Sequence, residues 1–302
     1  MGVSVAEYLG QRTDVAAPNI VPTLNKALCP FSAGNTCMKT GKGKNPICSV
    51  RKDDGTYWIV CENRLCTTKK DLPLCPHQQG ILLDIAQHVF DPTITLDRVS
   101  VKREVKLRVS NTEYKADYIM TIDNGQSPFS GPDRIILEMQ GGGETSGTEK
   151  LTKIVNDWKG SPAPTNTQLR AASGASTLET NAWRRQQEQF IVKGNIAMLT
   201  WKGYGIAFCV GTLLYDYLKN KIDFSTLPDL HQHNWTLALI GIKEDTSNPP
   251  HPGPVPLKVD ETRLLYTNYQ TFVHALINQG LPSPEAFKGA FVSLNNNPIV
   301  IP

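Results

Sequence analysis

The sequence predicts an α/β protein with a mixed central sheet flanked by helices and a small cysteine-rich module near the N-terminus. Short apolar runs bounded by turn residues alternate with amphipathic stretches of helical period, which predicts strands and helices in one chain. Six of the seven cysteines fall between Cys29 and Cys75, in a stretch rich in Pro, Gly and Lys that cannot form an apolar core. At 302 residues, 40% of them hydrophobic, the chain can bury a sizeable core in one large domain or two.

Three regions follow from this organisation. We expect residues 1–25 to form an N-terminal arm, a short helix and a Pro-containing linker, residues 26–75 the cysteine module, and residues 76–302 the main α/β domain. The net charge of +3 and the pI near 8.4 give a weak basic bias, which is compatible with a nucleic-acid surface. No run of 18 apolar residues occurs and the N-terminus lacks the layout of a secretory signal, so we expect a cytoplasmic protein with no membrane span.

The cysteine module predicts a metal site. Clustered cysteines without a secretion signal bind metal more often than they form disulfides. We expect four thiolates to form a tetrahedral structural site, because metal–thiolate bonds would supply the folding energy that an apolar core cannot. Cys66 or Cys75 could replace one of the four, and a set of reduced, unliganded thiols is the alternative. The four expected ligands, with their spacing, are Cys29-x7-Cys37-x10-Cys48-x12-Cys61.

Two apolar runs in the main domain carry acidic residues. Residues 114–120 and 133–140 each have the length and the flanking turns of a buried strand, and a turn-rich connection between them predicts a hairpin. An unpaired buried carboxylate costs several kcal/mol, roughly, so Asp117 and Glu138 need a cation or a functional reason. Glu138 and Gln140 leave the same face of their strand. Two carboxylates and an amide oxygen at one place predict a magnesium site.

The other elements follow from periodicity. Residues 80–90 have an apolar helical face and predict a helix that ends before Asp91-Pro92. Residues 99–109 alternate between apolar and polar side chains and predict a strand. Apolar spacing, apolar runs and helix breakers predict the remaining elements, in chain order: a strand over 57–60, a helix from 148 to Trp158, a helix over 176–193, strands over 196–201 and 205–210, a helix over 213–218, a strand over 235–242, a loop over 246–256 and a helix over 269–278.

Several of these segments together resemble the NotI and EagI group of type II restriction endonucleases. Glu138-x-Gln140, with Asp117 upstream, is similar to that group's variant of the PD-(D/E)XK nuclease core. The resemblance runs over most of residues 25–220. The further segments that carry it are Cys29-Pro30-Phe31, Cys37, Ile47–Arg51, Asp54-Gly55, Ile59–Leu65, Asn181–Arg185 through Lys193-Gly194, and Lys202–Phe208.

The resemblance implies a PD-(D/E)XK fold and a prokaryotic enzyme that cuts double-stranded DNA in a Mg²⁺-dependent reaction. Asp117 and Glu138 would hold Mg²⁺, and Gln140 would complete the catalytic set. Since a neutral amide is not a general base, Gln140 would orient the attacking water. The cysteine module would carry one structural iron or zinc ion and support DNA contacts, and it is too far from Glu138 in the sequence for any spacing to suggest a part in catalysis. A homodimer reading a G+C-rich palindrome, with GGCC as the first guess for its centre, is the expected assembly.

Basic side chains near these motifs are candidates for DNA contacts, and simple solvated charges are the alternative. Two other functions stay open: a nuclease that restricts modified DNA, and a non-catalytic DNA-binding protein that uses the metal module. The DNA-contact candidates are Arg51, Arg64, Lys115, Arg184, Arg185 and Lys193.

Overall fold

The structure, a computed structural model, describes residues 2–22, 26–66, 73–123, 131–143, 145–200, 204–279 and 284–301. Its centre is a mixed six-stranded sheet with the strand order β12-β11-β10-β7-β6-β5, in which β10 runs parallel to both of its neighbours and the other pairs are antiparallel. The expected α/β architecture with a mixed sheet is therefore confirmed. The six strands are β5 (Val99–Val109), β6 (Thr112–Ile122), β7 (Arg134–Gln140), β10 (Gly205–Gly211), β11 (Leu237–Glu244) and β12 (Leu257–Thr267).

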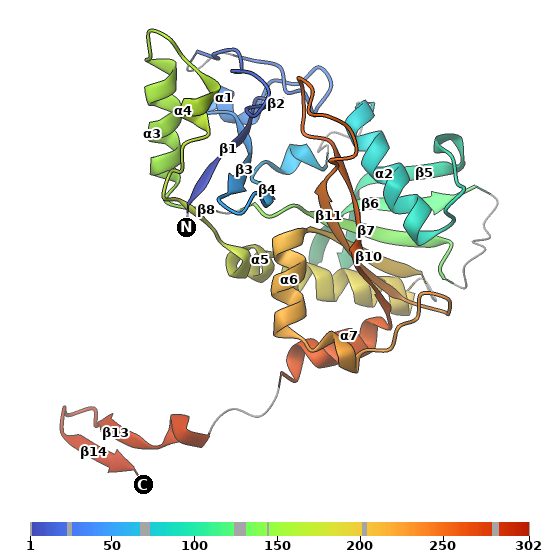
Figure 1. Cartoon of the computed structure of the whole chain (residues 1–302). Helices are drawn as coiled ribbons and strands as arrows, with labels where there is room; N and C mark the ends of the chain where they lie inside the picture. Colours follow the sequence, from blue (N-terminus) through green and yellow to red (C-terminus); the bar gives the residue numbers. More distant parts are fainter. Residues whose placement is uncertain are drawn as a thin grey trace.

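Helices cover both faces of this sheet (Figure 1). α5 (Glu179–Asn195), α6 (Thr212–Lys221) and α7 (Tyr269–Ile277) pack on one face, where Phe190 meets Phe208 of β10. α2 (Pro76–Val89) packs on the other, where Ile81 and Ile85 join a core that includes Leu137 of β7. Side chains of β7 alternate between these two cores, so a residue's position in the strand decides which face it serves. The four predicted helices near these positions are confirmed.

A second, antiparallel sheet has the order β2-β1-β3-β4 and holds the N-terminal region (Figure 1). The short helix expected within residues 1–25 is wrong, because β1 (Val3–Tyr8) is the second strand of this sheet. Val3 and Val5 alternate with Ser4, and branched residues with period two favour a strand. α3 (Thr148–Lys159) packs on this sheet through Trp158, whose ring meets that of Tyr8 edge-on at 5.1 Å. The remaining strands are β2 (Gln11–Arg12), β3 (Ile47–Lys52) and β4 (Tyr57–Ile59).

The strand expected over residues 196–201 is also wrong. Ile196–Thr200 form a π-helical turn, η3, that continues α5, and residues 201–203 lie outside the described residues. A short apolar run does not distinguish a strand from a buried helical segment, and here the preceding helix extends into it. Most of the turn-rich connection between β6 and β7, residues 124–130, lies outside the described residues as well.

The remaining elements are short, and no helix within the described ranges is long and apolar enough to cross a membrane. A C-terminal hairpin of β13 (Gly289–Val292) and β14 (Pro298–Ile301) stands apart from the main body (Figure 1). The other short elements are α1 (Met38–Gly41), η1 (Glu62–Arg64), η2 (Leu96–Arg98), β8 (Thr145–Ser146), α4 (Asn166–Leu169), β9 (Ser176–Thr177), η4 (Phe224–Thr226) and η5 (Pro284–Phe287).

Candidate active site

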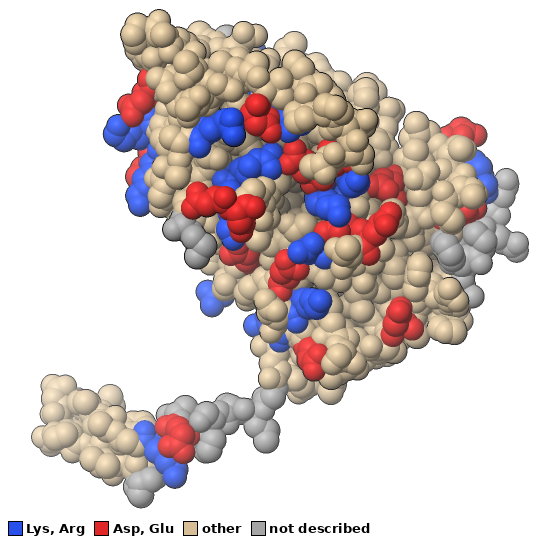
Figure 2. Space-filling model, viewed as in Figure 1, with Lys and Arg blue, Asp and Glu red and all other residues tan. Residues whose placement is uncertain are grey.

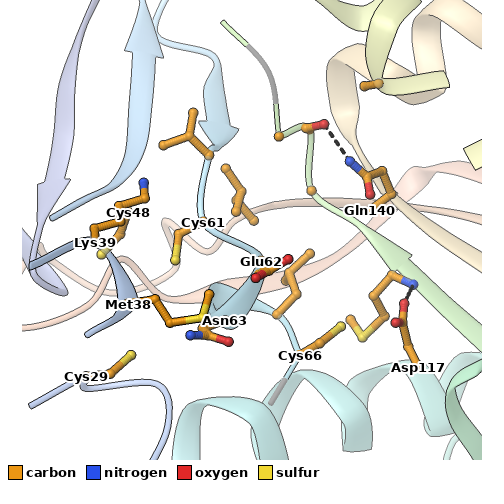
Figure 3. A pocket seen from close by; sticks show the side chains of 18 of the residues that line it. Cys29, Met38, Lys39, Cys48, Cys61, Glu62, Asn63, Cys66, Asp117 and Gln140 are labelled. Atoms are coloured by element: carbon orange, nitrogen blue, oxygen red, sulfur yellow. Dashed lines mark hydrogen bonds between the residues drawn. The ribbon is translucent and has the colours of Figure 1, made fainter. Parts of the chain in front are cut away.

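A cleft of about 420 Å³ brings the cysteine module and the acidic strands together. Cysteines lie on one side of the view in Figure 3, Asp117 and Gln140 lie on the other, and Cys66 lies between them. The backbone of β4 joins the two sides, since Gly143, just after β7, donates its N–H to the carbonyl of Ile59 at 2.7 Å. The cysteine module, which was expected to be structural, therefore lies against the end of β7 in the folded chain.

Strand pairing fixes the two acids side by side. β6 and β7 are antiparallel with Tyr118 opposite Leu137, so the next positions, Asp117 and Glu138, are neighbours at the edge of the cleft. The backbone N–H of Met139 donates to Asp117 Oδ2 at 2.9 Å and holds that carboxylate toward β7. The predicted hairpin pairing of the two acidic strands is confirmed.

Glu138 has one satisfied and one unsatisfied oxygen. Its Oε2 accepts a hydrogen bond from Lys193 Nζ at 2.6 Å, and the two side chains are only 5% and 1% exposed. Its Oε1 is buried and has no hydrogen-bond partner among the described residues. Burial raises the pKa of Glu138 to about 8, repulsion from Asp117 adds to the rise, and Lys193 opposes it. A buried, partnerless carboxylate oxygen beside a second carboxylate is a place that favours a cation.

Lys193 is a residue whose role the sequence did not reveal. It was expected as a DNA contact on a helix surface, but it is buried on α5 and paired with Glu138. Two other α5 side chains at helical spacing, Gln186 and Gln189, line the same cleft. The helical period of residues 179–195 could have predicted that Lys193 shares a helix face with Gln186 and Gln189. It could not have predicted the contact between Lys193 and β7.

Cys66 belongs to the acidic side of the cleft. Its side chain lies close enough to Asp117 to influence the pKa of that carboxyl group. Burial raises the pKa of Cys66, and the nearby Asp117 and Glu138 raise it further, so the thiol stays protonated. Burial likewise raises the pKa of Asp117, while the Met139 N–H and Lys193 oppose that rise. Cys66 therefore lies with the acidic strands, outside the cluster of Cys29, Cys37, Cys48 and Cys61.

Glu104, within the predicted strand over residues 99–109, is a third acid of the cleft. It lies opposite Asp117, since the flanking pairs are Arg103 with Tyr118 and Val105 with Ala116. Its φ of 49° is left-handed, which is strained for a non-glycine residue within a strand. Its carboxylate lines the cleft, with Lys115 Nζ at 3.8 Å. The alternation of β5 against β6 was the signal that could have found it.

Gln140 is held at both ends of its amide. Its Nε2 donates to the carbonyl of Gly142 at 2.5 Å, and its Oε1 accepts from Gln186 Nε2 at 2.9 Å. Figure 3 shows the first of these bonds. Because its oxygen already has a donor, Gln140 is a weaker candidate metal ligand than Asp117 or Glu138. Its fixed orientation suits a residue that positions a water or a phosphate.

The four cysteines expected as structural ligands gather in one place. Cys29, Cys37 and Cys48 are buried together, and Cys61 packs against them. Burial raises the pKa of Cys29 to about 11, and the neighbouring cysteines add to this rise. Within the described ranges, no three His, Cys, Asp or Glu side chains are already spaced as a closed ligand set. Four thiols in an apolar pocket nevertheless have the donor chemistry that zinc or iron takes.

The expected DNA contacts separate into two groups. Arg64 is wrong as a DNA contact, because its side chain is 0% exposed and pairs with Glu7 at 2.9 Å. Arg51 is partly buried and bound to Glu244 at 2.7 Å. Lys193 is buried, as described above. Lys115, Arg184 and Arg185 are exposed, and Lys115 and Arg185 line the cleft. Figure 2 shows basic and acidic side chains mixed over the visible face of the main body.

These observations describe a cleft with an acid pair, a buried lysine and an adjacent thiol cluster. The chain matches no protein-family model, and no curated protein matches it.

Proposed function

We propose that this cleft hydrolyses phosphodiester bonds in double-stranded DNA with the help of Mg²⁺. The observation that carries the proposal is the buried Glu138 Oε1, which has no partner in the described structure and lies beside Asp117. Carboxylate oxygens are the ligands that Mg²⁺ prefers, and a third acid of the same cleft, Glu104, adds to its negative potential.

Each polar side chain of the cleft has a separate role in the proposed in-line hydrolysis. Asp117 and Glu138 would hold the ion, which would supply an ionised water and neutralise the charge that develops on the phosphate. Lys193 lies against Glu138 Oε2, where it lowers the pKa of that carboxyl and so favours the ionised form that a metal needs. Gln140, fixed by Gln186, orients the attacking water rather than taking its proton. Preorganised groups of this kind act mainly by positioning and electrostatics.

The finer proposal is a type II restriction endonuclease that acts as a homodimer on a G+C-rich palindrome. The resemblance of the cysteine and Glu-x-Gln segments supports it. So does the position of the thiol cluster beside the acids, since a metal there would fix the wall of the cleft that faces DNA. We propose Cys29, Cys37, Cys48 and Cys61 as the ligands of one zinc or iron ion. The exposed Lys115, Arg184 and Arg185 are proposed phosphate contacts.

Cleavage of unmodified plasmid DNA with Mg²⁺ tests this proposal. The wild-type protein should give discrete fragments, and a chelator should abolish them. Asp117→Asn and Glu138→Gln should each lower the rate by about 10³-fold or more while DNA binding persists. Glu261→Gln, which changes an exposed carboxylate on β12 at the far edge of the sheet, is the matched control and should change the rate less than about twofold.

Other outcomes would redirect the proposal. A smear in place of bands would mean a non-specific nuclease, and cutting of modified DNA alone would mean a modification-dependent enzyme. Binding without cutting under any metal would leave a non-catalytic DNA-binding protein. Wild-type rates in Glu138→Gln would show that the chemistry lies elsewhere.

A further inference from the structure

One buried amide of the cleft has no part in the proposed hydrolysis. Asn63 of η1 is 4% exposed, its side chain lines the cleft, and its Oδ1 has no hydrogen-bond partner within the described ranges. In the view of Figure 3 this amide lies between Cys29 and Cys66, whereas Asp117 and Gln140 lie on the other side of the cleft. A buried oxygen without a donor is unfavourable, so a ligand that supplies an N–H or O–H gains free energy by binding there.

The turn that carries Asn63 is held in place by its neighbour in the chain. The backbone N–H of Arg64 donates to the carbonyl of Cys61 at 3.0 Å. The side chain of Arg64 is completely buried and pairs with Glu7 at 2.9 Å. The amide of Asn63 is therefore positioned before a ligand arrives, which lowers the entropic cost of binding one.

An exposed methionine lies on the same side of the cleft. Met38, the first residue of α1, is 44% exposed, lines the cleft and lies close to Asn63 in the view of Figure 3. A thioether packs favourably against aromatic rings. Three further apolar residues of the N-terminal region line the cleft: Leu9, Pro30 and Pro46. An apolar wall with one free amide oxygen suits a flat ring that carries polar groups at its edge.

Charge and hydrogen bonding indicate the chemical class of this ligand. Glu62, next to Asn63 in the chain, also lines the cleft and disfavours a phosphate group there. A nucleobase presents an uncharged edge on which an N–H donor lies beside an acceptor, and such an edge pairs with the Oδ1 and Nδ2 of one carboxamide. The cleft of about 420 Å³ is within the size range of sites for small ligands.

We propose that the cysteine side of the cleft is a pocket for one unstacked nucleobase, whose edge pairs with the amide of Asn63 and whose face packs on Met38. An amide that is almost completely buried cannot reach a base inside a duplex, so the base leaves the stack before it binds. This inference rests on the proposed function, since the base belongs to a DNA strand whose phosphodiester lies at Asp117 and Glu138. Asn63 and Met38 are then positioning residues that select how the strand lies in the cleft.

Calorimetric titration of the full chain without added Mg²⁺ tests the pocket separately from cleavage. Deoxyadenosine monophosphate (dAMP) should bind with a Kd on the order of millimolar. The matching deoxynucleotide of unsubstituted purine has no N–H on its base, and it should bind about 10-fold more weakly because Asn63 Oδ1 stays without a donor. A single-stranded oligonucleotide of four deoxyadenosines should bind about 10-fold more tightly than dAMP, because its phosphates reach Arg185 of the same cleft.

Three results of these titrations would overturn the proposal. Absence of dAMP binding at about 10 mM would remove the pocket. Equal Kd values for dAMP and the purine nucleotide would show that the amide does not read the base. Equal Kd values for dAMP and the oligonucleotide would assign the pocket to free nucleotides in place of DNA.

Two variants and a matched control locate the binding. Asn63→Leu should keep the wild-type unfolding temperature, because it replaces a poorly satisfied amide by an apolar side chain, and it should weaken dAMP binding by about 10-fold. Met38→Ser changes an exposed side chain and should weaken dAMP binding by about fivefold. Asn220→Leu makes the first change at an exposed residue of α6 that does not line the cleft, and it should leave the Kd unchanged. Wild-type Kd values in both Asn63→Leu and Met38→Ser would overturn the proposal.

The pocket and the proposed hydrolysis fail separately. Plasmid cleavage by a wild-type protein that does not distinguish dAMP from the purine nucleotide would remove the pocket and leave the nuclease. Selective binding of dAMP by a protein that cuts no DNA would support the pocket and remove the nuclease.

Discussion

Two buried glutamates each face a buried cation in this protein, yet their surroundings differ. Glu7 lies against Arg64, and both of its oxygens have donors, including Ser49, Tyr57 and the backbone N–H of Val255. Glu138 lies against Lys193, and one of its oxygens has no donor in the described structure. Both carboxylates are almost completely shielded from solvent.

Their pKa values move in opposite directions for this reason. Burial alone would raise the pKa of Glu7, but Arg64 and the hydrogen bonds from Tyr57 and Ser49 outweigh burial and lower it. At Glu138 burial raises the pKa by more than Lys193 lowers it, and repulsion from Asp117 raises the pKa further. A buried ion pair whose oxygens all have donors stabilises the packing of the elements that it joins. A buried ion pair with one oxygen that lacks a donor can still gain stability by binding a ligand. The Glu7 pair joins β1, β3, β4 and η1 to the loop before β12, and the Glu138 pair opens onto the cleft.

Breaking the satisfied pair should have the largest effect. Glu7→Gln leaves the Arg64 guanidinium buried without its carboxylate, and we expect a loss of about 3–5 kcal/mol in the free energy of unfolding. Glu138→Gln should cost about 1–2 kcal/mol, because the carboxylate it replaces is already poorly satisfied. Urea unfolding followed by fluorescence measures both. Equal losses would remove the distinction between the two sites.

Lys193, the cation paired with Glu138, should affect the rate of DNA cleavage. Lys193→Met is expected to lower cleavage by about 100-fold, because the charge that favours an ionised Glu138 is lost. Lys193→Arg should recover part of this rate, and the exposed Lys219→Met should leave it unchanged. Single-turnover assays well below the unfolding temperature separate the effect of each variant on the cleavage rate from its effect on stability. A fully active Lys193→Met protein would make Lys193 a purely structural residue.

Mg²⁺ should stabilise the protein through the cleft alone. At about 100 times its Kd, a ligand that binds only the folded state adds about 2.7 kcal/mol. This increment should persist in Glu7→Gln, once its lower baseline is allowed for, and disappear in Asp117→Asn. Thermal unfolding with and without Mg²⁺ measures it. An undiminished increment in Asp117→Asn would place the ion at another site.

Asp260 is a third buried carboxylate, and its contacts affect the stability of the protein at low pH. Burial would raise its pKa, but hydrogen bonds from Lys243, Thr262 and Arg263 outweigh burial and lower the pKa to about 2. Since this pKa is lower than in the unfolded chain, the stabilisation is complete above about pH 4 and is lost as the pH falls through about 2. Asp260→Asn should cost about 1 kcal/mol at pH 7 and flatten the pH dependence below about pH 4. An unchanged acid limb of the stability curve would contradict the assigned contacts.

Local patterns in the sequence were sufficient for much of the fold. Period-two and helical periodicities predicted β5, α2, α5 and α7, and the two acidic strands were predicted to pair. Patterns failed where a neighbour decided the outcome. Residues 196–200 continue α5, and Val3–Tyr8 pairs with β3, which begins only at Ile47. Arg64 was expected at the surface because it is charged. It is buried because its side chain pairs with Glu7, which lies 57 positions away in the sequence.

The sequence by itself determined that Asp117 and Glu138 lie in adjacent strands on one face, and it predicted that Cys29, Cys37, Cys48 and Cys61 gather in one place. Strand alternation and composition are local properties, so they can be read without coordinates. Only the tertiary structure decided that Lys193 reaches Glu138, that Glu104 and Cys66 join the acids, and that the thiol cluster borders the same cleft. These contacts depend on how a helix and a second sheet pack against β7, which is a collective property of the whole chain.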